Sequence, residues 1–440
     1  MKFIAKPSQQ WLQKRFRMIN VPNDLRPITD IDRVAEVDPH SVDLPQSAIV
    51  AMWEACQNLY RTGAYPLLSL CVRRRGEIVL NRSLGYLDEE RVATTQNPIC
   101  LFSASKAITS VLIHLLAEQG KIDLEAPVSR YIPAFGANGK GAITILQLLS
   151  HRGGVPRVPK GIDTQLLFDH EAALALVCEA EPVKHAGRIQ SYHAITSGFV
   201  FNELIKVTTG LNAQQYLDRY IRKPMGMRYF RYGLTKRDQA NVAINASTGL
   251  DNGLINKALT NVLGADPNSV VELTNDPRFF KSIIPSANLY ANAEEVTRFF
   301  QMLLNQGNWN GKQILQPKTV QGAVRAVGST QLDRTLMLPL RFSGGFMLGG
   351  APVGIYGLNT QQAYGHLGFA NIFCWADPQR EIAVSLMNTG KLVVGTHLKA
   401  LPLMLNAISS QCEPVRQSNG SAALRRATAE PFKKKHTRID

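Results

Sequence analysis

Residues 102–120 read FSASKAITSVLIHLLAEQG, and they are the most informative stretch of the chain. Residues 103–119 have the length and the apolar spacing of a buried helix, and Gly120 marks its end. Ser103 and Lys106 stand three residues apart, and positions i and i+3 share one face of a helix. The sequence therefore predicts an amine beside a hydroxyl at the start of a buried helix.

A serine hydroxyl becomes a good nucleophile when a base takes its proton, and a lysine with a lowered pKa can be that base. The apolar residues 107–116 supply burial that would lower this pKa. Unpaired backbone N–H groups at the helix start also favour negative charge on a reacting oxygen near Ser103. Taken alone, Ser-x-x-Lys is expected about once by chance in such a chain. The alternative is therefore a helix cap followed by a lysine that reaches solvent.

Regular elements are also predicted before this helix. The amphipathic residues 46–62 predict a helix, and residues 66–72 and 77–84 predict two strands. The segment between the strands, residues 73–76, reads RRRG. We expect its three arginines at a solvated hairpin tip, and an anion-binding site there is the weaker alternative.

After this helix, capping and stop signals predict more helices. Thr144 and Gln147 form a capping-box pattern before an apolar run. The other predicted helices cover residues 194–209 before Gly210, 292–305 and 393–409. From residue 342 onward a Gly-rich texture predicts strands at 344–348, 364–375 and 381–387, with a turn at 377–379.

Strands near both ends of the chain, with helices between them, predict an α/β (α+β) fold in which an antiparallel sheet is flanked by helices. An all-helical domain is expected to be inserted into this α/β unit, with a site in the crevice between the two. The expected divisions are an N-terminal arm at 1–44, a discontinuous α/β domain at 45–105 and 285–410, a mainly helical domain at 106–284, and a basic, disordered tail at 411–440.

Composition limits the classes of protein that this chain can be. Of its 440 residues, 45% are apolar and 19% are charged, which is enough to bury a large core. The formal net charge is +15, and residues 1–33 and 411–440 each carry +4 of it. No nucleic-acid-binding motif accompanies this charge. We therefore expect solvated ends, no specific nucleic-acid partner and at most weak peripheral membrane association through the basic ends.

Sequence features also bear on compartment and cofactors. No run approaches the roughly 18 apolar residues of a transmembrane segment, and Lys2 and Lys6 leave no room for the apolar stretch of a secretory signal. The six cysteines are scattered and form no Cys-x-x-Cys pair, which favours reduced core thiols in a cytoplasmic protein. No His-Glu-x-x-His run occurs, so we expect neither a metal ion nor another cofactor.

Three common enzyme motifs are absent: the Gly-x-Ser-x-Gly nucleophile elbow, the Walker phosphate loop and the dinucleotide-binding Gly-x-Gly-x-x-Gly that opens a helix after a strand. His-x-Gly occurs three times, starting at His151, His185 and His366. Only context separates the three, and the last lies in a strand-like run that leads into a hairpin. Isolated histidines of this kind are usually structural.

Several motifs follow one another in a defined order. They are FSASK at 102–106, GKIDLEAPVSRYIP at 120–133, ITILQLLSHRGG at 143–154, SYHA at 191–194, PMGM at 224–227 and YGHLG at 364–368. This order resembles the serine β-lactamase and penicillin-binding-protein fold family, in its class C-like branch with the related carboxylesterases. The resemblance runs from about residue 50 to 410 and leaves both charged ends outside.

The resemblance implies a β-lactamase/transpeptidase-like fold and a set of catalytic side chains. Ser103 matches the nucleophile that becomes acylated, and Lys106 matches its proton acceptor. Tyr192 matches the tyrosine of the family's Tyr-x-Asn element, which shuttles protons between the nucleophile, the leaving group and the incoming water. We expect a lowered pKa for Tyr192, because a lysine lies nearby.

The family's third element, Lys-Thr-Gly or His-x-Gly at the sheet edge, maps to residues 366–368. The resemblance thus assigns His366 and Gly368 to substrate binding. It also implies that the backbone N–H groups of Ser103 and Phe369 form the oxyanion hole. Such donors contribute about 3 kcal/mol each to transition-state stabilisation.

Two departures from the family pattern bear on the substrate. Ala194 replaces the asparagine of Tyr-x-Asn, which removes a side-chain amide that could contact Lys106 or a substrate amide. His366 replaces the lysine of Lys-Thr-Gly, and its expected partial charge near neutral pH weakens recognition of a substrate carboxylate. Both changes favour an esterase for small acyl esters over an efficient β-lactamase or cell-wall peptidase.

The leading hypothesis is therefore a serine hydrolase with carboxylesterase activity through a Ser103 acyl-enzyme. A second hypothesis is a β-lactamase, a D-amino-acid amidase or peptidase, or an acyltransferase that uses the same site. A third is a catalytically silent binding or scaffold member of the fold. Retention of Ser103, Lys106 and Tyr192 together argues against silence. In the enzymatic cases the partner is a small-molecule ester or amide.

Overall fold

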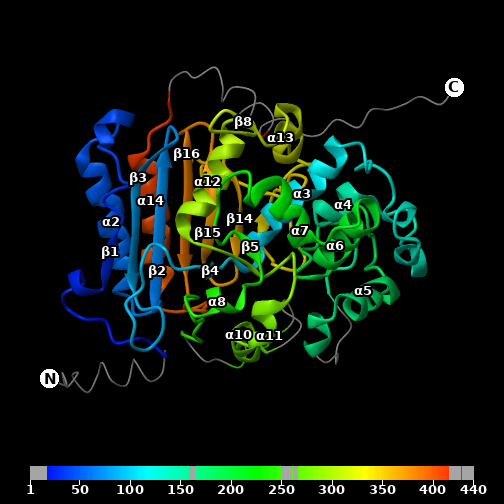
Figure 1. The fold of residues 1–440 in the computed structure, drawn as a ribbon, viewed down its shortest axis with the longest axis horizontal. Coiled ribbons are helices and arrows are strands. Elements are labelled where there is room, and N and C mark those ends of the chain that lie inside the picture. The colour runs from blue at the N-terminus through cyan, green and yellow to red at the C-terminus, as the bar shows by residue number, and fades with distance from the viewer. Residues whose placement is uncertain are drawn as a thin grey trace.

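The computed structural model describes residues 17–157, 164–249 and 266–415, together with the isolated positions Gly253, Lys257, Thr260 and Thr428. A seven-stranded antiparallel sheet with strand order β1-β3-β2-β16-β15-β14-β11 organises the molecule (Figure 1). Its strands are β1 (Thr29–Ile31), β2 (Leu67–Arg74), β3 (Glu77–Gly85), β11 (Met347–Leu348), β14 (Tyr364–Gly368), β15 (Ile372–Asp377) and β16 (Ile382–Asn388). Strands from the two ends of the chain meet where β2 pairs with β16.

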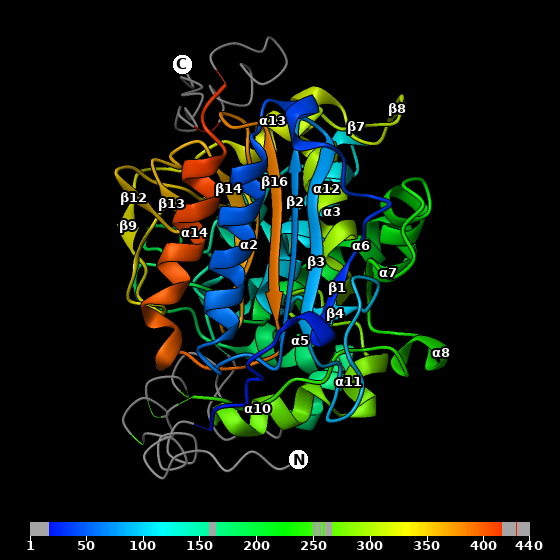
Figure 2. The same cartoon turned by 90° about the vertical axis from the view of Figure 1, so that its left-hand side faces the viewer.

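Helices cover both faces of this sheet. On one face α2 (Gln46–Tyr60) and α14 (Ala400–Gln411) pack side by side (Figure 2). On the other face α12 (Ala293–Leu304) packs against β2, β15 and β16. Every residue of these three strands is buried, as a sheet covered on both sides requires. The predicted antiparallel sheet flanked by helices is confirmed.

α3 (Ser105–Glu118) is buried along its residues 105–116 and packs against α6 (Thr196–Thr209), α7 (Ala213–Leu217) and α13 (Pro317–Val324). The other helices are α4 (Ile145–Leu149), α5 (His170–Glu179), α8 (Lys236–Gln239), α10 (Pro267–Thr274) and α11 (Pro277–Lys281). A small sheet with the order β4-β6-β5 lies beside α3; its strands are β4 (Ile99–Cys100), β6 (Leu289–Ala291) and β5 (Arg231–Tyr232). The short hairpins are β7 (Asn308–Trp309) with β8 (Lys312–Gln313), β9 (Gln331–Leu332) with β10 (Pro339–Leu340), and β12 (Val353–Gly354) with β13 (Gly357–Leu358).

Local signals in the sequence set several helix ends. The Thr144 side chain caps α4 and forms the complete capping box with Gln147. Asn292 caps α12 in the same way. α6 ends at Gly210, whose φ of 73° is the left-handed conformation that glycine adopts without a Cβ penalty. These helix boundaries depend on neighbouring residues only, and their prediction is confirmed.

The structure contradicts the expected solvated hairpin tip for two of the three arginines at 73–75. Arg73 and Arg74 are 6% and 4% exposed, because β2 continues to residue 74. Arg73 is paired with Glu294 of α12. Arg74 donates to the backbone oxygen of Glu413 at 3.0 Å. Only Arg75 lies in the turn, so the prediction is wrong for the other two.

The C-terminal strands and helix also differ from their predicted bounds. Residues 364–375 form two antiparallel strands, because Ala370 and Asn371 adopt φ values of 55° and 73° and reverse the chain after β14. The helix predicted at 393–409 begins at Ala400, after a 3-10 turn at Thr396–Leu398.

The predicted arm at 1–44 includes β1, which pairs with β3 at the edge of the large sheet. Most of the basic N-terminal stretch and of the basic C-terminal tail lies outside the described residues. Within the described ranges, no helix combines the length and the apolar character needed to cross a bilayer.

Candidate active site

Ser103 lies on a 3-10 turn, Phe102–Ala104, between β4 and α3. Phe102 has a φ of 47°, a conformation that is unfavourable for a bulky residue and that surrounding structure must enforce. Two hydrogen bonds to β6 hold the turn: Leu101 N–H donates to Leu289 O at 2.8 Å, and Leu289 N–H donates to Ser105 Oγ at 3.0 Å. The Ser103 side chain is only partly buried, whereas those of Phe102 and Ala104 are buried.

Lys106 points back from the first turn of α3 towards Ser103. Its Nζ lies 3.2 Å from Ser103 Oγ, 2.6 Å from Ala194 O and 3.0 Å from Ser286 O. The side chain is 6% exposed, and among the described residues no carboxylate forms an ion pair with it. Burial therefore lowers the pKa of Lys106 well below its usual 10.5. An amine held in this way can be neutral and accept a proton.

Tyr192 completes the cluster from the segment before α6. Its ring centroid lies 5.0 Å from Lys106 Nζ, and its side chain lies close to Ser103. Burial raises the pKa of Tyr192, and the nearby Ser103 hydroxyl offsets this only in part. The lowered pKa expected from the sequence is therefore wrong, because burial of the phenol penalises the phenolate more than its neighbours stabilise it. At neutral pH Tyr192 is a hydroxyl donor.

Ala194 replaces the family's asparagine, but its backbone still contacts Lys106. The carbonyl oxygen of Ala194 accepts the hydrogen bond from Lys106 Nζ at 2.6 Å. The backbone N–H of Tyr192, two residues earlier, donates to Asp333 Oδ1 at 3.1 Å. The segment that carries Tyr192 is therefore held by main-chain contacts that the substitution leaves intact.

β14 brings the 366–368 segment next to the Ser103 turn. A Cβ on Gly368 would lie 2.4 Å from Leu101 O, a distance that only glycine permits. The Phe369 ring is 5.7 Å from the Phe102 ring, measured between centroids. Gly368 and Phe369 thus lie beside the turn that carries Ser103.

The His366 side chain is fully buried. Its Nδ1 lies 2.7 Å from Leu367 O, and because a carbonyl can only accept, Nδ1 carries the proton. Its Nε2 has no hydrogen-bond partner among the described residues. Burial lowers the pKa of His366 to about 3, so the ring is neutral near pH 7 and the expected partial charge is wrong.

Two further histidines border the site: His151, which the sequence left among the structural residues, and His193, which the sequence did not single out. The His151 ring lies 4.6 Å from the Tyr192 ring, and the His193 backbone N–H donates to His151 Nδ1 at 3.1 Å. Burial lowers the pKa of both histidines, to about 3 for His193. His185 is exposed, so the structure separates the three His-x-Gly motifs: two of them meet at Tyr192 and the third does not. From the sequence, His151 could have been identified because it lies in the run at 143–154, and His193 because it directly follows Tyr192.

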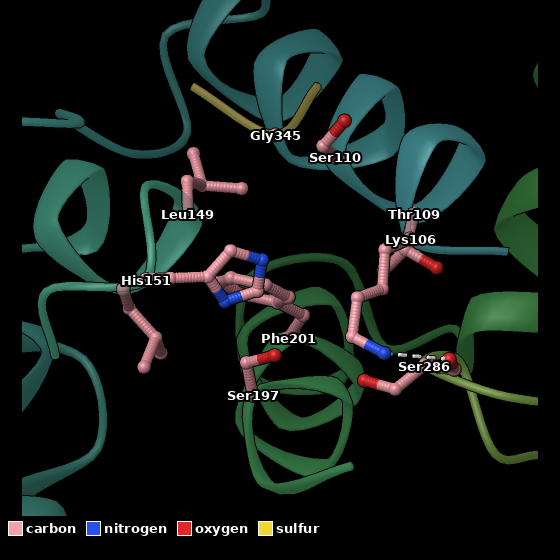
Figure 3. Close-up of a pocket in the computed structure, with 10 residues that line it drawn as sticks. Lys106, Thr109, Ser110, Leu149, His151, Ser197, Phe201, Ser286 and Gly345 are labelled. Carbon is pink, nitrogen blue, oxygen red and sulfur yellow. Dashed lines mark hydrogen bonds between the residues drawn. The ribbon is translucent and has the colours of Figure 1, made fainter. Parts of the chain in front are cut away.

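A small cavity lies on the inner side of Lys106 (Figure 3). Its volume is about 10 Å³, which is close to the space that one water molecule needs. Lys106 and Ser110 of α3 line it, together with His151, Ser197 of α6 and Ser286 (Figure 3). Lys106 therefore adjoins a mainly apolar pocket that is too small for a substrate.

The site contains groups for acyl transfer. Within the described part of the chain, no cluster of three His, Cys, Asp or Glu side chains could hold a metal ion. A partly exposed hydroxyl, a buried amine and a phenol converge instead, and a backbone turn lies next to the hydroxyl.

Comparison with known proteins agrees with this arrangement. The family model described as Beta-lactamase matches residues 49–406, which is most of the chain. The chain belongs to the beta-lactamase family. Members of this family are serine hydrolases that have a β-lactamase fold.

The proteins similar to this chain include an esterase/beta-lactamase, a penicillin-binding-protein homolog and a carboxylesterase. "Esterase/beta-lactamase LipL" of Mycobacterium tuberculosis is 28% identical over 300 residues, covering 66% of this chain and 68% of LipL. A penicillin-binding-protein homolog from Caulobacter crescentus superposes with a TM-score of 0.72 at 23% identity, covering 84% of this chain and 98% of that one. A family VIII carboxylesterase also has a TM-score of 0.72, at 22% identity, covering 84% of this chain and 99% of that one. At these identities the solved structures establish the fold alone.

Proposed function

We propose that the protein is a carboxylesterase for small acyl esters that works through an acyl-enzyme on Ser103. The observation that carries this proposal is the position of Lys106. Its Nζ lies 3.2 Å from Ser103 Oγ, its side chain is buried, and carbonyl oxygens rather than a carboxylate are its other partners. Such an amine can be neutral at working pH, and a neutral amine next to a hydroxyl is a general base.

The first half of the reaction forms the acyl-enzyme. Lys106 Nζ takes the Ser103 proton as Oγ attacks the ester carbonyl carbon, and the carbonyl oxygen becomes an oxyanion. The carbon–oxygen bond to the leaving alcohol then breaks. Tyr192 donates its hydroxyl proton to that alcohol and regains one from Lys106. Its raised pKa keeps the phenol protonated before this step, and its position close to Ser103 places it near the leaving alcohol. The products of this half are an ester on Ser103 and a free alcohol.

The second half releases the acid. A water molecule loses a proton to the Tyr192–Lys106 pair and attacks the acyl carbon, the bond to Ser103 Oγ breaks, and Oγ regains a proton. In both halves the backbone N–H groups of Ser103 and Phe369 bind the oxyanion in our proposal. Support for this role comes from Gly368, because its close approach to Leu101 O brings residue 369 beside the Ser103 turn.

The chemistry around His366 supports esters over substrates that carry a carboxylate. A charged lysine at this position could pair with a substrate carboxylate, whereas the buried His366 ring is neutral near pH 7. We assign His366 and Gly368 to shaping the substrate side of the site. The name esterase/beta-lactamase of the Mycobacterium tuberculosis relative and the carboxylesterase of similar fold agree with this preference.

A second candidate keeps the same acyl-enzyme and changes the acyl donor or acceptor. The penicillin-binding-protein homolog of similar fold supports a β-lactamase or a D-amino-acid amidase or peptidase. An acyltransferase would use an alcohol or amine in place of water. Parallel assays with p-nitrophenyl acetate, a chromogenic cephalosporin and a D-alanyl-D-alanine peptide rank these activities by kcat/KM, and the proposal requires the ester to rank first.

The test of the proposal is covalent labelling. We expect a fluorophosphonate to add one adduct to the intact mass of the wild-type protein and none to the Ser103→Ala variant. Ser410→Ala is the matched control, because Ser410 is an exposed serine on α14 and its Oγ donates to Ala407 O within that helix. An unlabelled wild-type protein that also cleaves no p-nitrophenyl ester would favour the scaffold hypothesis.

The predicted division at residues 44, 105, 284 and 410 stays a prediction. The cytoplasmic location is also a proposal, and it is supported by the six cysteines, which are all buried and unpaired.

A further inference from the structure

A second buried lysine lies behind the Ser103 turn. Lys391 follows β16, and its side chain is 6% exposed. Its Nζ lies 4.6 Å from the centroid of the Phe102 ring. The same amine donates to the backbone oxygen of Asn388 at 2.8 Å and lies 3.4 Å from Asn388 Oδ1. Among the described residues no carboxylate forms an ion pair with Lys391.

Asn388 connects this lysine to the turn between β14 and β15. Its side-chain amide donates to Ala370 O at 3.0 Å and to Asn371 O at 2.8 Å. Asn371 Nδ2 in turn donates to Leu392 O at 3.1 Å, next to Lys391. The turn that begins at Phe369 is therefore tied at several points to the segment that follows β16.

Lys391 is thus linked to both backbone segments that carry the proposed oxyanion donors, directly to one and through Asn388 to the other. On one side it lies over the ring of Phe102, which directly precedes Ser103. On the other side it acts through Asn388 on the turn that contains Phe369. The Phe102 and Phe369 rings also contact each other, with 5.7 Å between centroids. These two segments are more than 260 residues apart in the sequence.

Stability alone does not explain a lysine at this place. Burial lowers the pKa of Lys391 to about 7, which means that the folded protein disfavours its charged form. The nearby Cys100 thiol has a pKa raised to about 11 and provides no anion near neutral pH. An unbranched apolar side chain of similar length would avoid this desolvation cost. We therefore infer a role for Lys391 other than stability, and its contacts with Phe102 and Asn388 indicate which role.

We propose that Lys391 is a positioning residue that holds the Phe102–Ser103 turn and the Phe369–Asn371 turn in the relative arrangement that lets both N–H groups reach one oxyanion. This inference rests on the proposed function, because it assumes that Ser103 and Phe369 supply those groups. Lys391 does not touch the reacting atoms in this proposal. It acts through Phe102 and Asn388.

The test is the steady-state kinetics of Lys391→Met, which keeps the unbranched length and removes the amine. We expect kcat for p-nitrophenyl acetate to fall about 10- to 100-fold, because misplacing a donor by a fraction of an ångström weakens binding of the transition state. We expect KM to stay nearly unchanged, because the oxyanion hole binds the ground-state carbonyl much more weakly than the transition state. The rate of fluorophosphonate labelling should fall with kcat. The thermal midpoint should not fall, whereas a merely structural role would lower it together with kcat.

Two further variants keep the result interpretable. Asn388→Asp removes the amide that binds Ala370 O and Asn371 O, so it should lower kcat in the same way, and it provides the test if Lys391→Met does not fold. Lys140→Met is the matched control: Lys140 is a fully buried lysine whose Nζ donates to the carbonyls of Ala137 and Cys178 at 2.8 Å, and its loss should leave kcat unchanged.

Wild-type kcat in folded Lys391→Met, or in Asn388→Asp where the first variant does not fold, would overturn this inference while leaving the proposed function intact. A wild-type protein that is neither labelled nor active on the ester would instead overturn the proposed function itself. The two failures are therefore distinguishable.

Discussion

Replacing Gly368 with alanine would move the backbone that carries Phe369. The new Cβ would lie 2.4 Å from Leu101 O and 2.8 Å from Ile372 Cβ, and real Cβ contacts shorter than 3.0 Å essentially do not occur. The first of these obstacles is backbone, so β14 and the Ser103 turn would have to separate by about 0.6 Å to reach that limit. A misplacement approaching 1 Å in an active site costs up to about 10²-fold in rate. We therefore expect kcat to fall about 10- to 100-fold, which corresponds to about 1.4–2.7 kcal/mol of transition-state stabilisation.

The assay is p-nitrophenyl acetate hydrolysis by the purified variant, with circular dichroism to verify the fold. Gly322→Ala is the matched control: Gly322 lies within α13, and its added Cβ would meet nothing within 4 Å. Alanine there should leave kcat unchanged and stabilise the protein by about 0.5–1 kcal/mol. A folded Gly368→Ala enzyme with the kcat of the wild type would refute the reasoning, because it would show that residue 369 tolerates the displacement.

Three further predictions concern the base, the phenol and the tail. Because burial lowers the pKa of Lys106 well below 10.5, kcat/KM should rise as pH increases through that lowered value and level off well before pH 10.5, since the ammonium form below it cannot accept the Ser103 proton; a rate that rises only near pH 10.5 would contradict a neutral base. Tyr192→Phe should reduce kcat about 10²- to 10⁴-fold with the fold intact by circular dichroism, because it removes the proton relay; a near-normal kcat would remove Tyr192 from the mechanism. Removing residues 416–440 should leave ester hydrolysis nearly unchanged, because the truncated chain keeps Val415, whose N–H donates to Gln379 O at 2.9 Å, although it loses the buried Thr428; a large loss of activity would show that this segment supports the active fold.

Predictions from the sequence succeeded where an element depends on residues a few positions apart. The capping box of Thr144 and Gln147 and the stop of α6 at Gly210 are local, and both are as predicted. The predictions failed where contacts with a distant segment of the chain determine the structure. Arg73 is buried because Glu294 of α12 pairs with it across 221 positions of sequence, and no local pattern near residue 73 contains that information.

The same distinction applies to the candidate site. The order of motifs singled out Ser103, Lys106 and Tyr192, and the structure brings these three side chains together. The electrostatic expectation for Tyr192 was wrong, because it considered a neighbouring charge and not the burial of both groups. Lys391 was not recognised, because its importance comes from contacts with Phe102 and Asn388 that the motifs do not include.

By itself the sequence determined the shared face of Ser103 and Lys106, since the helical repeat alone places residues three apart on one side. Tertiary structure decided the protonation states of Lys106, Tyr192 and His366, because desolvation depends on how much of the rest of the chain packs around each group. It also decided where Phe369 lies, since that position depends on a close approach of two backbone segments more than 260 residues apart.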